Sequence, residues 1–281
     1  MPELPEAEVA ARQLRERVVG ATVRDCWIGR EDIVREGLPS LDQYRQAKIA
    51  GVERKGKSVI LHFLCGKEPR FLVAELGMTG LLLFRSTLTK HPQHTHFILH
   101  LDGCCEPDIR YWNPRRFGRL SLLDRAGLDR YVARRFGHDP LTISHEQFLR
   151  VLRATRSRLK SLLMRQQVIA GIGNIYANEI LFRSRLHPNQ PSNSIPGKSI
   201  TRLHQGMGEV LREAIAMGGS SVRDYFAPDG TEGQYKRRHL VYAKSGNTCP
   251  NGCGAVIKRS VGERSSFYCP RCQRIRSPRF D

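Results

Sequence analysis

The spacing of apolar residues changes from helical to strand-like early in the chain. Ala10, Leu14 and Val18 recur every four residues and so lie on one face of a helix, which Gly20 ends. Beyond Gly20 the apolar residues come in short runs rich in Val, Leu, Ile and Phe, separated by glycine, proline or charged turns. Such a series fits an antiparallel β-sandwich or barrel that ends at about residue 125. The runs predict strands near residues 22–28, 58–64, 70–76, 81–85, 96–101 and 117–123.

Helical spacing returns in the second half of the chain. Ser144 and Gln147 form a capping-box pattern ahead of the apolar Phe148 and Leu152. The segment 218–240 is polar, basic and rich in glycine, which predicts a loop. The cysteine-containing C-terminal segment is too short to hold a core of its own. Further helices are predicted over residues 157–167, 174–182 and 199–217.

The composition favours a soluble protein with a polyanionic partner. Of the 281 residues, 40% are hydrophobic and 26% are charged, which excludes disordered and fibrous classes. The 46 Lys and Arg against 27 Asp and Glu give a net charge of +19. That excess favours nucleic acid as the partner, with a ribosome-associated or merely basic protein as the plainer alternative. Since the sequence contains no membrane span and no signal peptide, we expect a cytoplasmic location.

Four cysteines near the C-terminus have the spacing of a metal site. Cys249 and Cys253 are separated by three residues, Cys269 and Cys272 by two, and fifteen residues lie between the pairs. Two close pairs on two turns can converge on one tetrahedral Zn²⁺, and a closed four-thiolate site is structural rather than catalytic. Lys258 lies between the pairs, so the hairpin presents either a nucleic-acid contact or a solvated basic face.

The N-terminus offers a different kind of chemical group. Removal of Met1 leaves Pro2 as a free secondary amine, and an α-amine has a reference pKa of about 8. A helix begins directly after it, and the positive end of the helix dipole disfavours the ammonium form. Such an amine can attack a sugar carbon and form a Schiff base, with Glu3 and Glu6 nearby to move protons. The plainer interpretation is an ordinary first turn, in which Pro and Glu are common.

The run Met1–Glu8 resembles the N-terminus of the formamidopyrimidine-DNA glycosylases. The resemblance continues at the family's spacing through Lys57, Leu76–Gly80, His94–His96, Asn113–Gly118 and Gly171–Phe182. It implies an α+β fold whose residues 1–133 form an N-terminal antiparallel β-sandwich with a leading helix. It further implies a helix–two-turn–helix bundle with a lesion-recognition loop over residues 134–240, and a zinc-finger β-hairpin with one structural Zn²⁺ over residues 241–281.

The resemblance also implies catalytic roles for five residues. Pro2 matches the family's nucleophile, and Glu3 matches the acid that protonates the opening deoxyribose. Glu6 matches a further acid that positions the N-terminus. Lys57 would bind a phosphate beside the lesion and assist β-elimination. Arg264 resembles the finger arginine that binds phosphate and is linked to δ-elimination.

A second group of residues matches the family's contacts with DNA. A damaged base must leave the stack before its sugar can be reached, and the hole that it leaves must be filled. The family's void-filling trio corresponds to Met78, Arg115 and Phe117. The expected contacts with the DNA backbone are His94, Arg115, Arg156, Asn174 and Lys258.

The activity that the resemblance implies is that of a monomeric, nucleoid-associated DNA glycosylase and abasic-site lyase of base-excision repair. Its partner would be double-stranded DNA that contains 8-oxoguanine, formamidopyrimidines or abasic sites. An oxidised-pyrimidine glycosylase of the endonuclease VIII type is an alternative, but that branch usually has Gly at the position of Leu4. A catalytically silent relative that binds damaged DNA is a second alternative.

Three positions depart from the family's usual pattern. The first zinc pair, Cys249 and Cys253, has three intervening residues where two are usual, and Arg165 replaces an acid. Glu75 stands where many members have a histidine. A carboxylate near the phosphate path is expected to repel DNA; alternatively, Glu75 pairs with a nearby arginine and stays off the DNA.

Overall fold

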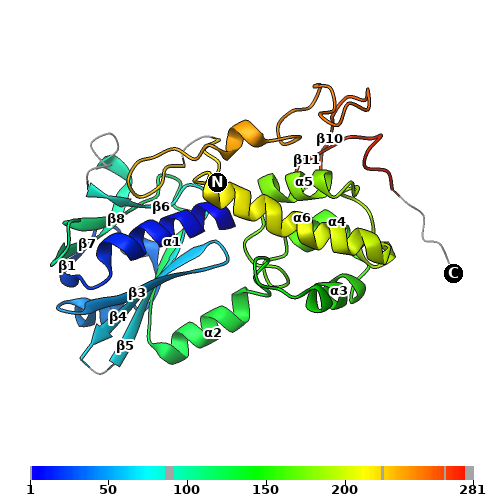
Figure 1. Cartoon of the computed structure of the whole chain (residues 1–281). Coiled ribbons are helices and arrows are strands. Elements are labelled where there is room, and N and C mark those ends of the chain that lie inside the picture. Colours follow the sequence, from blue (N-terminus) through cyan, green and yellow to red (C-terminus); the bar gives the residue numbers. More distant parts are fainter. Residues whose placement is uncertain (1, 67, 86–91, 223–224, 263, 276–281) are drawn as a thin grey trace. The chain divides into compact units, whose positions relative to one another are not determined.

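The computed structural model describes residues 2–66, 68–85, 92–222, 225–262 and 264–275, and its elements are labelled in Figure 1. The chain divides into two compact units. The first unit combines Met1–Arg135 with Ala214–Lys236, and the second combines Phe136–Glu213 with Arg237–Asp281. Among the described helices, each is too short or too polar to cross a membrane.

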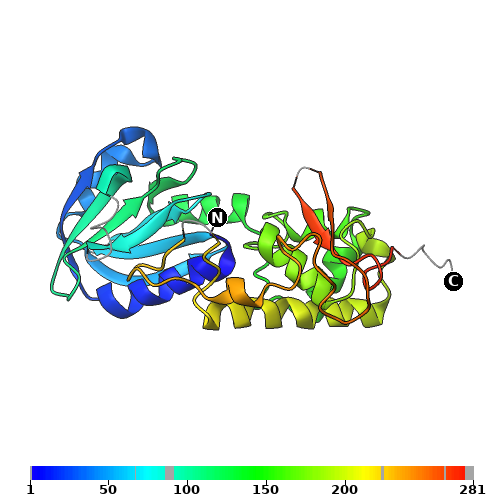
Figure 2. The same ribbon diagram turned by 90° about the horizontal axis from the view of Figure 1, so that it is seen from above.

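The first unit begins with helix α1 (Leu4–Val18). Pro5 lies in its first turn, where a backbone N–H is not needed, and the helix ends before Gly20, whose φ is +94°. Leu14 and Val18 are fully buried, as the four-residue spacing predicts. The helix lies along β3 and β4 of the sheet, which Figure 2 shows from above.

Nine strands follow, in the hydrogen-bonded order β2-β9-β5-β4-β3-β1-β7-β8-β6. The apolar pattern does not predict β2, β3 or β8, because charged residues and, in β3, Gly51 dilute the alternation of these strands. The strands are β1 (Thr22–Ile28), β2 (Val34–Glu36), β3 (Lys48–Lys55), β4 (Ser58–Cys65), β5 (Glu68–Glu75), β6 (Leu81–Phe84), β7 (Thr95–Asp102), β8 (Asp108–Trp112) and β9 (Arg119–Leu123).

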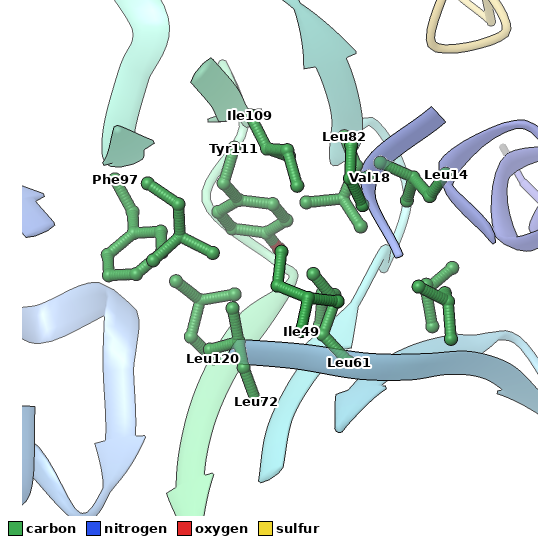
Figure 3. Close-up of a cluster of buried hydrophobic side chains, with 14 of the residues drawn as sticks. Leu14, Val18, Ile49, Leu61, Leu72, Leu82, Phe97, Ile109, Tyr111 and Leu120 are labelled. Atoms are coloured by element: carbon green, nitrogen blue, oxygen red, sulfur yellow. The ribbon is translucent and has the colours of Figure 1, made fainter. Parts of the chain in front are cut away.

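The array folds over one hydrophobic core. Strands β1 and β3 are joined through a single pair, Thr22 and Lys48, so the sheet divides into two halves at that point. All other pairings are antiparallel except that of β2 with β9, which is parallel. Side chains from both halves meet in the core in Figure 3: Leu82, Phe97, Ile109 and Tyr111 from one half, and Ile49, Leu61, Leu72 and Leu120 from the other.

Helix α2 (Arg125–Arg135) is the last element of the N-terminal segment of the first unit. The pattern of apolar residues does not predict this helix. The second unit contains α3 (His145–Arg153), α4 (Leu159–Leu163) and α5 (Asn174–Arg183), while α6 (Gly197–Ala216) runs into the segment that returns to the first unit. Short 3₁₀ turns lie at Glu31–Ile33, Leu38–Tyr44, Pro92–His94, Ser192–Ser194 and Tyr235–Arg238.

Helix α4 is shorter than the predicted helix over residues 157–167. The Gln166 side chain explains the early end, because its amide nitrogen donates to the carbonyls of Met164 and Ile172 at 2.7 and 2.9 Å. Its amide oxygen accepts the N–H of Gly171, whose φ is +103°. Gln166 therefore stabilises a turn where the apolar pattern continues a helix, and this turn leads into α5.

The last element is a hairpin of β10 (Lys258–Ser260) and β11 (Ser266–Tyr268). It lies beside α5, as Figures 1 and 2 both show, and the N–H of Phe267 donates to Asn178 Oδ1 at 2.8 Å. The described part of the loop 218–240 has few regular elements, as predicted. Residues 223 and 224 of this loop lie outside the described residues.

Candidate functional site

The start of α1 places two carboxylates next to Pro2. Pro2 is buried, and Glu3 and Glu6 are 1% and 0% exposed. The two acids form a capping box, in which Glu6 Oε2 accepts the N–H of Glu3 at 2.8 Å. The carboxylate of Glu6 therefore fixes the backbone directly after Pro2.

The other oxygen of Glu6 binds a segment far away in the sequence. Glu6 Oε1 accepts the N–H of Ser220 at 2.7 Å, and the phenol of Tyr225 donates to the Glu6 carbonyl at 3.2 Å. Burial raises the pKa of Tyr225 well above its usual value, so this phenol stays a neutral donor. Gly219 has a φ of +82°, and a Cβ there would lie 2.8 Å from Glu6 Oε1. One buried carboxylate thus connects the N-terminus with the loop 218–240.

Lys57 lies in the tight turn between β3 and β4. The turn is closed by the pairing of Lys55 with Ser58, and Gly56 between them has a φ of +56°. The side chain of Lys57 is half-buried. Lys57 lies two positions after Lys55, the last residue of β3, so the pairing of β3 with β4 fixes the position of its backbone.

The three residues of the predicted void-filling trio come from two loops that pack together. Met78 follows β5 and is partly buried, whereas Arg115 and Phe117 are exposed, Phe117 by 56%. A Cβ on Gly77 would lie 2.5 Å from the Gly118 nitrogen, so the backbones of the two loops approach each other closely. The Arg115 guanidinium lies over the Phe117 ring at 4.9 Å from the centroid. An exposed aromatic ring paired with a cation is a surface able to stack on a nucleic-acid base.

Glu75 does not stand alone at the end of β5. Its Oε1 accepts from Arg35 Nη1 at 2.7 Å and forms an ion pair with Arg135, whose Nη1 lies 3.1 Å away, and its side chain is 17% exposed. Glu75 therefore pairs with two arginines, Arg35 and Arg135, where the sequence analysis offered a pair with one nearby arginine as the alternative.

Asn174 occupies the first turn of α5, after Gly173 as its N-cap. Its backbone carbonyl accepts from Asn178 at 2.6 Å, and its side chain is partly buried. Asn174 thus lies at a helix N-terminus, the kind of position at which proteins often bind anions.

A basic pocket of about 540 Å³ lies between α4 and the β10–β11 hairpin. Arg158, Arg165 and Arg264 line it, and all three side chains are exposed. Lys160 is 5% exposed, and its ammonium donates to the Ser265 carbonyl at 2.6 Å and to Ser266 Oγ at 3.0 Å. Arg165, the departure from the family's acid, thus adds a positive charge beside Arg264.

The four predicted zinc ligands come together. The Sγ atoms of Cys249, Cys253, Cys269 and Cys272 all lie within 4.8 Å of one another. Cys249 and Cys272 are 3.8 Å apart and Cys253 and Cys269 are 3.5 Å apart. Zn–S bonds of about 2.3 Å in a tetrahedron require S···S separations of about 3.8 Å, so the thiols fit one structural Zn²⁺. Gly252 accommodates the extra residue of the first pair with a φ of +66°.

The remaining predicted contacts are surface residues. His94, which ends a 3₁₀ turn before β7, is exposed, as are Arg156 and Lys258. The first unit holds Pro2, Glu3, Glu6, Lys57, Met78, His94, Arg115 and Phe117, and the second holds Arg156, Asn174, Lys258, Arg264 and the zinc ligands.

The sequence analysis does not find two polar residues that organise the second unit. Glu179 is 1% exposed, and its carboxylate accepts the N–H groups of Leu240, Val241 and Tyr242 at 2.7 to 3.1 Å. Lys160 is the other. Its position inside the apolar run Leu159–Leu163 could have indicated a structural role from the sequence, because a charged residue on the buried face of a helix requires a partner.

The basic pocket and the four-thiolate site of the second unit, and the aromatic–cation pair of the first, are typical of a zinc-containing protein that binds nucleic acid. Two family models match the chain: the formamidopyrimidine-DNA glycosylase N-terminal domain over residues 1–120 and the formamidopyrimidine-DNA glycosylase H2TH domain over residues 136–225. The chain belongs to the formamidopyrimidine-DNA glycosylase family.

Full-length relatives and solved structures agree with this assignment. The formamidopyrimidine-DNA glycosylase of Thermus thermophilus is 38% identical over 97% of this chain and 98% of its own. That of Roseiflexus sp. is 38% identical over 98% of this chain and 100% of its own. The crystal structure of MutM (Fpg) from T. thermophilus matches with a TM-score of 0.85 and 36% identity, over 98% of this chain and 100% of that one. The complex of Lactococcus lactis Fpg with DNA containing an abasic site matches with a TM-score of 0.86 and 30% identity, over 97% and 99%.

Proposed function

We propose that this protein is a base-excision repair enzyme that removes oxidised purines from duplex DNA and then cleaves the strand, with Pro2 as its nucleophile. The observation that carries the proposal is the buried carboxylate of Glu6, which binds the N–H of Glu3 on one side and that of Ser220 on the other. This arrangement fixes the backbone that directly follows Pro2, and with it the position of Glu3. The name and DNA-bound structures of the relatives support DNA as the substrate, as does the net charge of +19.

The chemistry follows from an amine next to a carboxylic acid. The Pro2 nitrogen attacks C1′ of the damaged nucleotide, the glycosidic bond breaks, and its electron pair leaves with the base, which takes up a proton. The Pro2 nitrogen gives up its proton to the Glu3 carboxylate, Glu3 passes that proton to the ring oxygen as the sugar ring opens, and a Schiff base forms between Pro2 and C1′. The Glu3 carboxylate then accepts a proton from C2′, which expels the 3′ phosphate, and a second elimination expels the 5′ phosphate. Water releases the sugar fragment and restores the amine.

Other residues serve this reaction by binding the DNA. Lys57 binds a phosphate beside the lesion and assists the first elimination, and Arg264 binds a phosphate and assists the second. Met78, Arg115 and Phe117 fill the space that the extruded base leaves, which offsets a stacking loss of a few kcal/mol. The proposed contacts with the DNA backbone are His94, Arg115, Arg156, Asn174 and Lys258.

The proposal extends to domains and location. As functional segments of the sequence, residues 1–133 form the catalytic domain, residues 134–240 the helix–two-turn–helix domain with the lesion-recognition loop, and residues 241–281 the zinc finger. By its packing, Ala214–Lys236 of the middle segment belongs to the first unit, and the finger belongs to the second. The zinc stabilises the finger that carries Lys258 and Arg264. We place the protein, as a monomer, in the cytoplasm in association with the nucleoid.

Borohydride trapping tests the nucleophile. With a duplex that contains 8-oxoguanine, the protein with a free Pro2 should give a covalent adduct, and a variant with residues added before Pro2 should give none. Equal trapping by both proteins would refute the assignment of Pro2. A panel of duplexes with oxidised purines or oxidised pyrimidines separates the proposed substrate from the endonuclease VIII type, and a failure to cleave any of them would indicate a non-catalytic relative.

A further inference from the structure

One end of the sheet in the first unit carries a row of charged residues across neighbouring strands. The register pairs Arg119 of β9 with Glu75 of β5, Glu75 with Ser58 of β4, and Ser58 with Lys55 of β3. Arg119 and Lys55 therefore lie in the same cross-strand row as Glu75. Lys57 lies in the turn at the end of that row.

Glu75 binds two further cations from outside the row. Arg35 belongs to β2 and donates through its Nη1 to Glu75 Oε1 at 2.7 Å, and Arg135, which ends α2, forms an ion pair with the same oxygen at an Nη1···Oε1 distance of 3.1 Å. The carboxylate is 17% exposed, whereas the side chains of Arg35 and Arg135 are 39% and 35% exposed. The acid is thus largely covered, and both arginine side chains are more exposed than the acid that they bind.

This network borders the loops with the exposed aromatic residue. The backbone carbonyl of Glu75 accepts from the Tyr111 phenol at 2.6 Å, and a Cβ on Gly118 would lie 2.2 Å from that carbonyl. Glu75 lies three residues before Met78, and Gly118 directly follows Phe117. The network of Arg35, Glu75 and Arg135 is thus joined through the backbone of Glu75 to the loops that carry Met78 and Phe117.

We propose that Arg35 and Arg135 bind a phosphodiester of the DNA backbone, and that Glu75 is the positioning residue that holds the two guanidinium groups together. The proposal rests on the proposed function, because it takes duplex DNA as the ligand. The trio of Arg35, Glu75 and Arg135 keeps a net charge of +1. Without the carboxylate the two guanidinium groups repel each other and lose their shared anchor, so their donors no longer converge on one anion.

The direction in which Glu75→Gln changes the affinity for DNA distinguishes this proposal from simple repulsion of DNA by Glu75. If Glu75 merely repels DNA, Glu75→Gln must tighten binding. If Glu75 positions two arginines, Glu75→Gln weakens binding although it removes a negative charge. Glu36→Gln is the matched control, because Glu36 is exposed on the same strand as Arg35 and the substitution makes the same change in charge.

The test measures the affinity of the full-length zinc-loaded protein for a duplex with an abasic-site analogue across a salt series. Glu75→Gln should weaken binding about 3–10-fold near 0.1 M salt and lower the salt slope by about 0.9, the value for one phosphate contact. Arg35→Gln should lower the slope by the same amount, while Glu36→Gln keeps the parental slope and binds at least as tightly. Thermal unfolding of each variant is recorded in parallel.

Two results would overturn the proposal. One is equal or tighter binding by Glu75→Gln with an unchanged slope, whatever its thermal stability, since that would leave Glu75 with a structural role only. The other is an unchanged slope in Arg35→Gln, which removes one cation together with its hydrogen bond to Glu75 and keeps the Arg135–Glu75 pair. Borohydride trapping by the parent protein is scored separately, so a failure of the proposed enzyme activity is distinguishable from a failure of this phosphate site.

Discussion

The substitution Glu6→Gln tests the connection between the N-terminus and the loop 218–240. The Glu6 carboxylate is fully buried and accepts two backbone N–H groups, from Glu3 at 2.8 Å and from Ser220 at 2.7 Å. An amide of the same shape has one oxygen and one NH₂ group. It can therefore accept from only one of the two N–H groups and must turn a donor toward the other.

The cost can be worked from this geometry. A hydrogen bond to a charged group contributes about 1.5–3 kcal/mol, and the donor that faces a donor adds a penalty, so we expect a loss of about 2–4 kcal/mol in the free energy of unfolding. For a unit of this size the midpoint of thermal unfolding should fall by roughly 5–15 °C. Borohydride trapping on an 8-oxoguanine duplex should fall as well, because Glu3 and Pro2 lose their fixed position.

The assay compares thermal unfolding and trapping of Glu6→Gln with those of Glu16→Gln, an exposed acid on the same helix. The control should stay within about 0.5 kcal/mol of the parent. Gly219→Ala perturbs the same contact from the loop side and should also lower the midpoint, since its φ is +82° and its Cβ would meet Glu6. A parental midpoint in Glu6→Gln would refute the reasoning, and parental trapping would show that the contact does not serve catalysis.

Three further predictions concern other parts of the molecule. Lys57→Ala should slow excision of 8-oxoguanine about 10²-fold or more in single-turnover assays and affect a preformed abasic site less; excision at the parental rate would exclude the proposed role. Cys249→Ser should lose the bound zinc, measured by metal analysis, together with duplex affinity; full DNA binding by the metal-free variant would contradict this. Burial lowers the pKa of His239 to about 4. Between about pH 6.5 and pH 4 the unfolded chain therefore binds a proton at this histidine that the folded chain does not bind. The free energy of unfolding consequently falls as the pH drops through this range. In His239→Asn the fall in unfolding free energy over that range should be about 1–3 kcal/mol smaller than in the parent, and equal falls would show that His239 does not titrate in this way.

The parts of the fold that depend on local pattern can be predicted. The four-residue spacing in α1 is visible in the sequence because a helix has a fixed period. Six of the nine strands are predictable because each forms a short apolar run between turn residues. The zinc ligands are predictable because the spacing of Cys249, Cys253, Cys269 and Cys272 is itself the requirement of the site.

Contacts between distant residues could not be predicted. Ser220 binds Glu6 across 214 positions through a backbone N–H, which every residue except proline has, so nothing in the side chain of Ser220 reveals the contact. Glu75 illustrates the same limit for a charged group. The sequence shows a carboxylate among many arginines, and only the sheet register and α2 determine that Arg35 and Arg135 are its partners.

The interleaving of the two units constrains how this protein can be made. The second unit needs Phe136–Glu213 and Arg237–Asp281, with a segment of the first unit between them. A ribosome adds about 5–20 residues per second, so for several seconds the nascent chain has the earlier piece without the later one. During that time the carboxylate of Glu179 lacks the three N–H groups of residues 240–242, and Asn178 lacks Phe267. A chain that ends before residue 240 therefore lacks all three of these backbone donors and leaves the buried carboxylate of Glu179 without them.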